Sequence, residues 1–253
     1  MNKIILLMLF FLTGNLLLCE ARQEEELFAG ANKLYMDQSY EKAAEAFEKL
    51  IATGKVAPEV YFNLGNAYYK TGNVAAAILN YERARRLRPS DPDIAYNLRI
   101  ANLATIDKIE PAPQLFYEKW WDEFVNEGSL NVRAWVVILL LWLSLAVAAV
   151  YLFSNSVFIK KISFFVSILL LLSGAFTCYL TYAQHRYLNN HKAAIIFAMS
   201  AYAKSSPDDK SANLFLLHAG TRIEVLDELK GWKKVRIANG NEGWIAADAI
   251  EII

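Results

Sequence analysis

Residues 61–89 read YFNLGNAYYKTGNVAAAILNYERARRLRP, and this stretch decides the fold of the N-terminal part of the chain. Within it, large and small residues recur at the spacing of two helix faces that pack against each other. These residues are Leu64, Gly65, Tyr68, Ala77, Tyr81 and Ala84. Gly72 and Asn73 form the turn between the helices, and Pro89 ends the second helix. The stretch therefore predicts a closely packed helix pair.

The same scheme occurs once more, 34 residues earlier. Moving the pattern back by 34 positions gives a looser copy, made of Leu27, Gly30, Ala31, Leu34, Ala43, Phe47 and Leu50. A helix pair with this period is the signature of the tetratricopeptide repeat (TPR), which stacks into a scaffold that holds partners.

A third segment, from Asp91 to about Thr105, begins like another first helix of the repeat. Pro111 and Pro113 prevent the second helix that would complete it. Terminal repeats are commonly atypical because they cap the stack. The sequence therefore predicts an α-helical solenoid of two TPRs and a capping helix over residues 22–106.

The first helix of each repeat leaves one face open toward the concave side of the stack. The residues on this face follow the same order in both repeats: Phe28, Asn32, Tyr35, Phe62, Asn66, Tyr69 and Lys70. They predict a groove that stacks on a side chain and hydrogen-bonds to the backbone of a partner peptide. The alternative, which stays open, is that the aromatics pack against the capping helix or the membrane-proximal segment. Some TPRs clamp a C-terminal carboxylate between paired asparagines and lysines. Asn32 and Asn63 resemble these asparagines, but Phe28 and Asp93 occupy the positions of the lysines. A carboxylate clamp is therefore not expected.

The N-terminus has the composition of a secretory signal, because Met1-Asn2-Lys3 is followed by an apolar run that reaches Leu18. Small residues at Cys19 and Ala21 predict a signal peptide over residues 1–21, cleaved after Ala21. Two alternatives stay open: lipidation of Cys19, and an uncleaved anchor helix.

Two later segments, 134–153 and 162–183, carry no charged residue. Each is long enough to cross a hydrocarbon core of about 30 Å as a helix. The connection at 154–161 is short and contains Lys160 and Lys161, which favours the cytoplasmic side. Both flanks then face outward, in agreement with an exported N-terminus. We expect a bacterial inner-membrane protein with two spans and both large domains in the periplasm.

Residues 107–133 connect the repeats to the first span. The start of this linker is extended because of its two prolines. The aromatic and charged stretch 116–124 includes Trp120 and Trp121, which favours a helix that lies at the membrane interface. The alternative is that this helix packs against the last TPR helix.

From about Asn190 onward the pattern becomes that of β-strands, separated by Gly, Pro, Asn and Asp turns. The predicted strands are 193–198, 214–217, 221–226, 232–238 and 243–246. Short strands without a helix indicate a small barrel over residues 190–253. The Gly231-Trp232 pair and the triplet Gly243-Trp244-Ile245 resemble a bacterial SH3-like domain, which implies a recognition module. Trp232 and Trp244 are then a candidate ligand face; alternatively, both fill the core of a small barrel.

Motifs of catalysis are missing from the sequence. His185, His191 and His218 have no Cys or carboxylate at ligand spacing, and there is no phosphate-binding loop or nucleophile elbow. The formal net charge of zero and the lack of a basic, aromatic-interleaved stretch argue against nucleic acid as a partner. We therefore expect neither enzyme activity nor a metal or other cofactor.

The whole arrangement is that of a multidomain membrane protein with a TPR solenoid, two transmembrane helices and a C-terminal all-β SH3-like barrel. In this order it resembles the BatE-like proteins of the Bacteroides aerotolerance (Bat) group. That resemblance implies a role beside membrane proteins with von Willebrand factor A-type domains and a MoxR-type ATPase, in envelope integrity or oxidative tolerance. The expected function is a non-enzymatic scaffold for such partners; the alternative is a cell-wall sensor or tether whose SH3-like domain binds peptidoglycan.

Overall fold

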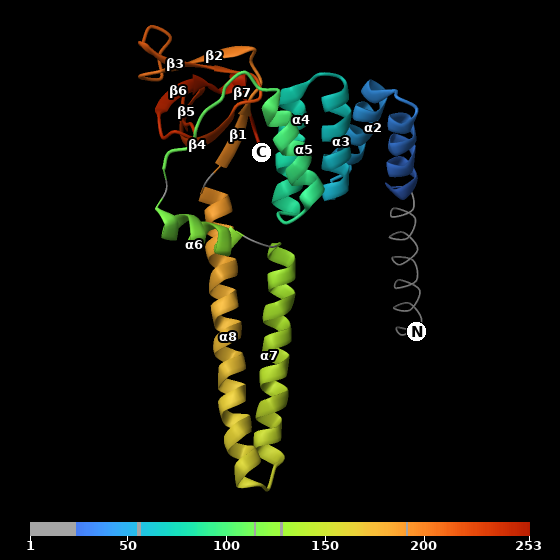
Figure 1. Cartoon of the computed structure of the whole chain (residues 1–253), viewed down its shortest axis with the longest axis vertical. Helices are drawn as coiled ribbons and strands as arrows, with labels where there is room; N and C mark the ends of the chain where they lie inside the picture. Colours follow the sequence, from blue (N-terminus) through green and yellow to red (C-terminus); the bar gives the residue numbers. More distant parts are fainter. Residues whose placement is uncertain (1–23, 55–56, 114, 127–128, 191) are drawn as a thin grey trace, which may run out of the picture.

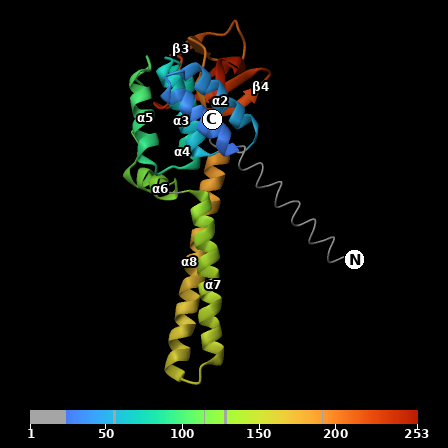
Figure 2. The ribbon, with the colours of Figure 1, turned by 90° about the vertical axis from the view of Figure 1, so that its right-hand side faces the viewer.

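The computed structural model describes residues 24–54, 57–113, 115–126, 129–190 and 192–253. The predicted signal peptide and Cys19 lie outside these residues. Helical repeats and a β domain lie side by side and form one head, from which a long helical hairpin projects (Figure 1). The view turned by 90° shows the same division into head and hairpin (Figure 2).

The repeats are built from a helix over 24–36 followed by four more helices. These are α2 (Tyr40–Ala52), α3 (Pro58–Lys70), α4 (Val74–Leu87) and α5 (Pro92–Leu103). Asn73 caps α4 by accepting a hydrogen bond from the N–H of Ala76, and Asp91 caps α5 in the same way. Gly72 has a φ of +82°, which a residue with a side chain rarely adopts.

The small and large residues of the repeat pattern meet as predicted inside each helix pair. In the second pair, a Cβ atom on Gly65 would lie 2.7 Å from the Tyr81 ring, so only glycine lets α3 approach that ring. In the first pair, Ala31 is the equivalent of Gly65, and it lies in one buried cluster with Ala43 and Phe47. The repetition of the pattern after 34 residues therefore reflects two equivalent packing arrangements, one in each helix pair.

The hairpin consists of α7 (Leu130–Phe153) and α8 (Val157–Asn190). Both helices are long and apolar enough to cross a membrane, and little of their apolar surface is buried inside the structure. Ser144 and Ser167 exchange hydrogen bonds between the two helices, with each hydroxyl donating to the other residue's carbonyl oxygen. Residues 157–161 belong to α8 and not to the predicted loop, because apolar residues before Lys160 continue the helical pattern.

Helix α6 (Phe116–Asn126) lies across the upper end of the hairpin, below the head (Figure 1). It packs against α8. The guanidinium group of Arg133 donates to the carbonyl oxygens of Phe124 and Val125 and so satisfies the C-terminal end of α6. Phe116 and Trp120 remain 85% and 63% exposed, respectively.

The β domain is one antiparallel sheet of seven strands in the order β3-β2-β6-β5-β4-β1-β7. The strands are β1 (Lys192–Ile196), β2 (Ser200–Lys204), β3 (Asn213–His218), β4 (Arg222–Leu229), β5 (Trp232–Arg236), β6 (Glu242–Ala246) and β7 (Ile250–Ile252). Every strand contributes to a single buried cluster, so the sheet curls round one core. A Cβ atom on Gly243 would lie 2.8 Å from that of Ala203, so glycine allows β6 to approach β2. Strands β2 and β7, which are short and flank turns, were not among the predicted strands.

The β domain docks directly on the second repeat. Ile195 of β1 is buried in the cluster that α4 and α5 form, and Ile253 packs against the same cluster. Arg83 donates to the carbonyl oxygen of Ile252 at 2.9 Å, and Arg86 donates to that of Ile253 at 2.6 Å. The repeats and the β domain therefore share a hydrophobic core.

The first part of the predicted linker completes this docking. Asp107 accepts hydrogen bonds from His218 and Thr221, Ile109 packs against the core of the β domain, and the N–H of Ala112 donates to Ala238. Residues 107–112 of the linker thus pack against the β domain before the chain reaches α6. No local pattern indicates this docking, because the residues that pair in it are distant in the chain.

Candidate functional site

Two pairs of asparagines connect the first helices of the stack. Asn63 Nδ2 donates to Asn32 Oδ1 at 2.8 Å, and Asn97 Nδ2 donates to Asn66 Oδ1 at the same distance. The second pair lies 34 residues after the first, so the two pairs are equivalent. Asn97 belongs to the capping helix α5 and was not predicted as a site residue; shifting Asn63 by one repeat would have found it.

The second pair is fixed by the core beneath it. The hydroxyl group of Tyr81 donates to Asn66 Oδ1 at 2.7 Å, so this oxygen accepts two hydrogen bonds. Burial raises the pKa of Tyr81, so its hydroxyl group stays protonated and remains a donor. In the part of the chain that the structure describes, Asn66 Nδ2 and Asn97 Oδ1 have no hydrogen-bond partner. One donor and one acceptor thus remain available at this position.

A cavity of about 260 Å³ surrounds the second asparagine pair. It is lined by Tyr35, Asn66, Tyr69, Lys70, Tyr81, Asn97 and Ile100. The structure therefore brings together four of the predicted groove residues, from both repeats, and adds three that were not predicted. Desolvation, with a contribution from Tyr40, raises the pKa of Tyr35. The cavity combines aromatic surface, an amide pair and one cationic side chain, which suits binding rather than bond making.

The other three predicted groove residues lie elsewhere. The ring of Phe28 packs against that of Phe47 with their centroids 6.0 Å apart, and Phe62 packs against Tyr81 at 5.9 Å. Both phenylalanines thus face the second helix of their own repeat. This arrangement differs from the two predicted alternatives, which were a place in the groove and packing against the capping helix or the membrane-proximal segment. Asn32 is bonded to Asn63 in the first amide pair.

The two tryptophans of the β domain lie on the outer face of the sheet. In β5 and β6, the buried residues Val235 and Ile245 alternate with Trp232 and Trp244, which are half-buried. Trp244 is the partner of Lys234 on β5 and of Lys204 on β2. Neither tryptophan belongs to the core cluster of the β domain. The alternative prediction, that Trp232 and Trp244 fill the core of the barrel, therefore does not hold in this structure.

Ionic groups surround this aromatic face. Glu242 bonds to Lys234 at 2.7 Å and to Arg236 at 2.6 Å. Hydrogen bonds from Lys234 and Arg236 lower the pKa of the Glu242 carboxyl. Among the described residues, no group of three His, Cys, Asp or Glu side chains could hold a metal ion.

Comparison with known proteins identifies both folded regions. Residues 28–92 match the tetratricopeptide repeat family, and residues 200–251 match the bacterial SH3 domain family. No curated protein matches the chain.

Among solved structures, one similar chain is the C-terminal SH3 domain of myosin IB from Entamoeba histolytica bound to EhFP10(GEF) peptide, at 24% identity. The match covers 25% of this chain and 93% of that chain, with a TM-score of 0.18. The same domain without the peptide matches at 23% identity over 25% of this chain and 95% of that chain, also with a TM-score of 0.18. The family matches confirm the predicted domain types: this chain carries tetratricopeptide repeats and a bacterial SH3 domain.

Proposed function

We propose that this chain is a non-enzymatic, membrane-anchored scaffold whose TPR groove binds an extended segment of a partner protein. The observation that carries the proposal is the Asn66–Asn97 pair, which keeps one donor and one acceptor available inside a cavity shared by both repeats and the capping helix. A peptide backbone offers the complementary acceptor and donor at every residue.

The groove would bind a peptide through three kinds of contact. Asn66 Nδ2 would donate to a backbone carbonyl oxygen of the partner, and Asn97 Oδ1 would accept from a backbone N–H. Tyr35 and Tyr69 offer aromatic surface for a partner side chain. Lys70, exposed at the cavity, favours an acidic residue near that side chain.

The membrane part of the proposal rests on α7 and α8. With both helices across the inner membrane, the lysine-bearing end of the hairpin would face the cytoplasm and the head would face the periplasm. The exposed aromatic side chains of α6 would lie at the membrane surface beneath the head. For the partner class, the resemblance to the Bat group favours membrane proteins with von Willebrand factor A-type domains.

A photocrosslinking experiment in membranes tests the groove. A benzophenone amino acid is placed at Ile100, which lines the cavity, and in a control chain at Tyr96, which is exposed on the same helix outside it. We expect a partner protein to crosslink at position 100 and to be lost when Asn66→Ala and Tyr69→Ala are combined. The double variant Tyr96→Ala with Asn102→Ala is the matched control and should retain the partner. Equal crosslinking at both positions, or retention in the groove variant, contradicts the proposal.

A second function is favoured by the bacterial SH3 domain match together with the half-exposed Trp232 and Trp244. In this function the β domain binds peptidoglycan and tethers the head to the cell wall. The test is retention of the detergent-solubilised chain on peptidoglycan sacculi, with Trp244→Ala as the binding variant and Lys210→Ala, on an exposed turn, as the control. No retention of the unchanged chain rules out this tether.

A further inference from the structure

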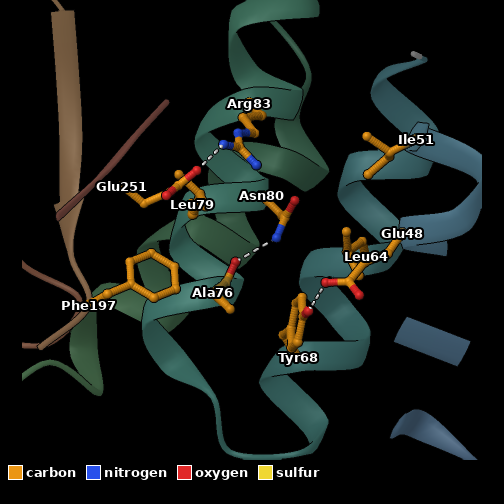
Figure 3. Close-up of a pocket in the computed structure, with 10 residues that line it drawn as sticks. All are labelled: Glu48, Ile51, Leu64, Tyr68, Ala76, Leu79, Asn80, Arg83, Phe197 and Glu251. Atoms are coloured by element: carbon orange, nitrogen blue, oxygen red, sulfur yellow. Dashed lines mark hydrogen bonds and ion pairs between the residues drawn. The ribbon is translucent and has the colours of Figure 1, made fainter. Parts of the chain in front are cut away.

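A second cavity lies where the repeats meet the β domain, and it shares no lining residue with the groove cavity. It has a volume of about 370 Å³ and is bounded by α2, α3, α4 and two residues of the β domain. Figure 3 shows its lining residues, with Phe197 and Glu251 on one side and Glu48 and Ile51 on the other. Neither family match assigns a site here.

Asn80 is the unusual residue of this cavity. Its side chain is buried, with 3% of the residue exposed, and its Nδ2 atom donates to the carbonyl oxygen of Ala76 at 2.8 Å. Its Oδ1 atom is buried and has no hydrogen-bond partner among the residues that the structure describes. In Figure 3 the oxygen lies on the side away from Ala76, in the space between α4 and the facing helices. A buried acceptor without a donor is costly, which points to a ligand that supplies the donor.

The charged groups of the same cavity also favour a donor. Glu48 and Glu251 contribute two carboxylates, and Arg83 is the one cation among the described lining residues, so these three side chains sum to a charge of −1. Tyr68 donates to Glu48, and Arg83 forms an ion pair with Glu251 at 3.3 Å. Each carboxylate has more lone pairs than these contacts use, so acceptors outnumber donors.

The remaining wall is apolar. Ile51, Leu79 and Phe197 line the cavity and can cover a hydrocarbon chain. A lysine side chain has this composition, with an aliphatic stem and a head that carries three donors and no acceptor.

We propose that this junction cavity binds a lysine side chain of a partner protein. The ammonium group donates to Asn80 Oδ1 and to the carboxylate of Glu48, which lies on the same side of the cavity, and the stem lies against the apolar wall. Because Glu48 belongs to the repeats and Phe197 of the apolar wall to the β domain, the bound lysine contacts both domains and stabilises their docking. This site lies outside the groove and can be occupied independently of it.

The first experiment compares two peptides on the full chain in detergent. The probes are acetyl-Ala-Lys-Ala-amide and the same peptide with norleucine, which keeps the stem and removes the ammonium group. Titration calorimetry or saturation-transfer NMR should show that the lysine peptide binds at least about tenfold more tightly, as expected for charge-assisted hydrogen bonds. Equal binding of the two peptides overturns the proposal, as does binding of the free diamine cadaverine without binding of the lysine peptide.

The second experiment uses matched variants. Asn80→Leu should weaken binding of the lysine peptide about tenfold. Asn102→Leu is the control, because Asn102 makes the same side-chain bond to the carbonyl oxygen of Leu98, on α5 and outside the cavity. Asn80→Leu should not lower the melting temperature, since it removes an unpaired buried oxygen.

Glu48→Gln provides a test that does not disturb the core, because Glu48 is exposed; Glu45→Gln on the same helix is its control. We expect Glu48→Gln to weaken lysine binding several-fold and Glu45→Gln to leave it unchanged. If Asn80→Leu lowers the melting temperature while binding persists, Asn80 is a structural residue and the proposal fails. It also fails if Glu48→Gln binds the lysine peptide as tightly as the unchanged chain.

Discussion

The carboxylate of Asp107 lies 2.7 Å from the Nδ1 atom of His218, which joins the segment after the last repeat helix to strand β3. The same carboxylate accepts from the N–H of His218 at 2.7 Å and from the hydroxyl group of Thr221 at 2.6 Å. One side chain thus satisfies three groups of the β domain and fixes the repeats beside it.

Replacing this side chain should loosen the docking. Asp107→Asn removes the charge and an acceptor oxygen from three hydrogen bonds, so we expect a loss of about 1–3 kcal/mol in the free energy of unfolding. Chemical denaturation of the full chain in detergent measures this loss. Glu110→Gln, exposed on the same segment, is the control and should change little. A stable Asp107→Asn chain would mean that the hydrophobic contacts alone hold the domains together.

The effect of Asp107 should depend on pH with a defined sign. Burial raises the pKa of this carboxyl, but hydrogen bonds from Thr221 and His218 outweigh it and hold the pKa below its usual range. A lowered pKa in the folded state stabilises the protein above the pKa of the unfolded state, which is about 3.9. We therefore expect the difference in melting temperature between the unchanged chain and Asp107→Asn to be full at pH 6. It should shrink as the pH falls below about 4. A difference that is constant down to pH 3 would contradict this linkage.

Two glycines of the repeats should respond to alanine in opposite directions. Gly65→Ala places a Cβ atom 2.7 Å from the Tyr81 ring and should cost about 1–3 kcal/mol. Gly30→Ala meets no atom of the described residues within 4 Å and should stabilise the helix over 24–36 by up to about 1 kcal/mol. Thermal unfolding followed by circular dichroism compares them. Similar effects of both substitutions would show that helix propensity, and not packing against Tyr81, decides the outcome at Gly65.

The two faces of β6 should differ in their contribution to stability. Ile245 is fully buried in the core of the β domain, so Ile245→Ala should cost about 2–5 kcal/mol. Trp244→Ala, on the outer face, should cost about 1 kcal/mol or less. Denaturation of the two variants tests the assignment. If Trp244→Ala proves as destabilising as Ile245→Ala, this tryptophan supports the fold and the case for a ligand face is weakened.

The direction of the hairpin can be tested by cysteine labelling in a background that carries both Cys19→Ser and Cys178→Ser. Asn155→Cys lies in the turn between α7 and α8, and Lys210→Cys lies on an exposed turn of the β domain. With a periplasmic head, a membrane-impermeant maleimide should label Lys210→Cys in intact spheroplasts. It should label Asn155→Cys only after lysis. Labelling in the reverse order would place the head in the cytoplasm.

The sequence predicted those features that depend on local periodicity. The close approach at Gly65 and Tyr81 follows from a helical pattern, and the hairpin follows from charge-free segments of sufficient length. The structure divides the residues that were predicted to line the groove: four of them surround one cavity, and the other three lie elsewhere. Phe28 and Phe62 pack against the second helix of their own repeat, whereas Tyr35 and Tyr69 line the cavity.

Features that depend on long-range contacts could not be predicted. Asp107 and His218 are 111 residues apart, and nothing in the local pattern of either segment indicates the other. Strands β2 and β7 were missed for a related reason, since their short segments become strands through pairing with β3, β6 and β1. The junction cavity exists only after this docking, so none of its residues stood out as a site.

The packing of Ile253 has a practical consequence for how the protein should be tagged. Its side chain contacts the cluster formed by α4 and α5, and its carbonyl oxygen is held by Arg86. An affinity tag or reporter joined directly at this residue would compete with the contacts that keep β7 against the repeats. The exposed turn at 206–211, between β2 and β3, is a better place for an inserted label, because it leaves the seam between the two domains untouched.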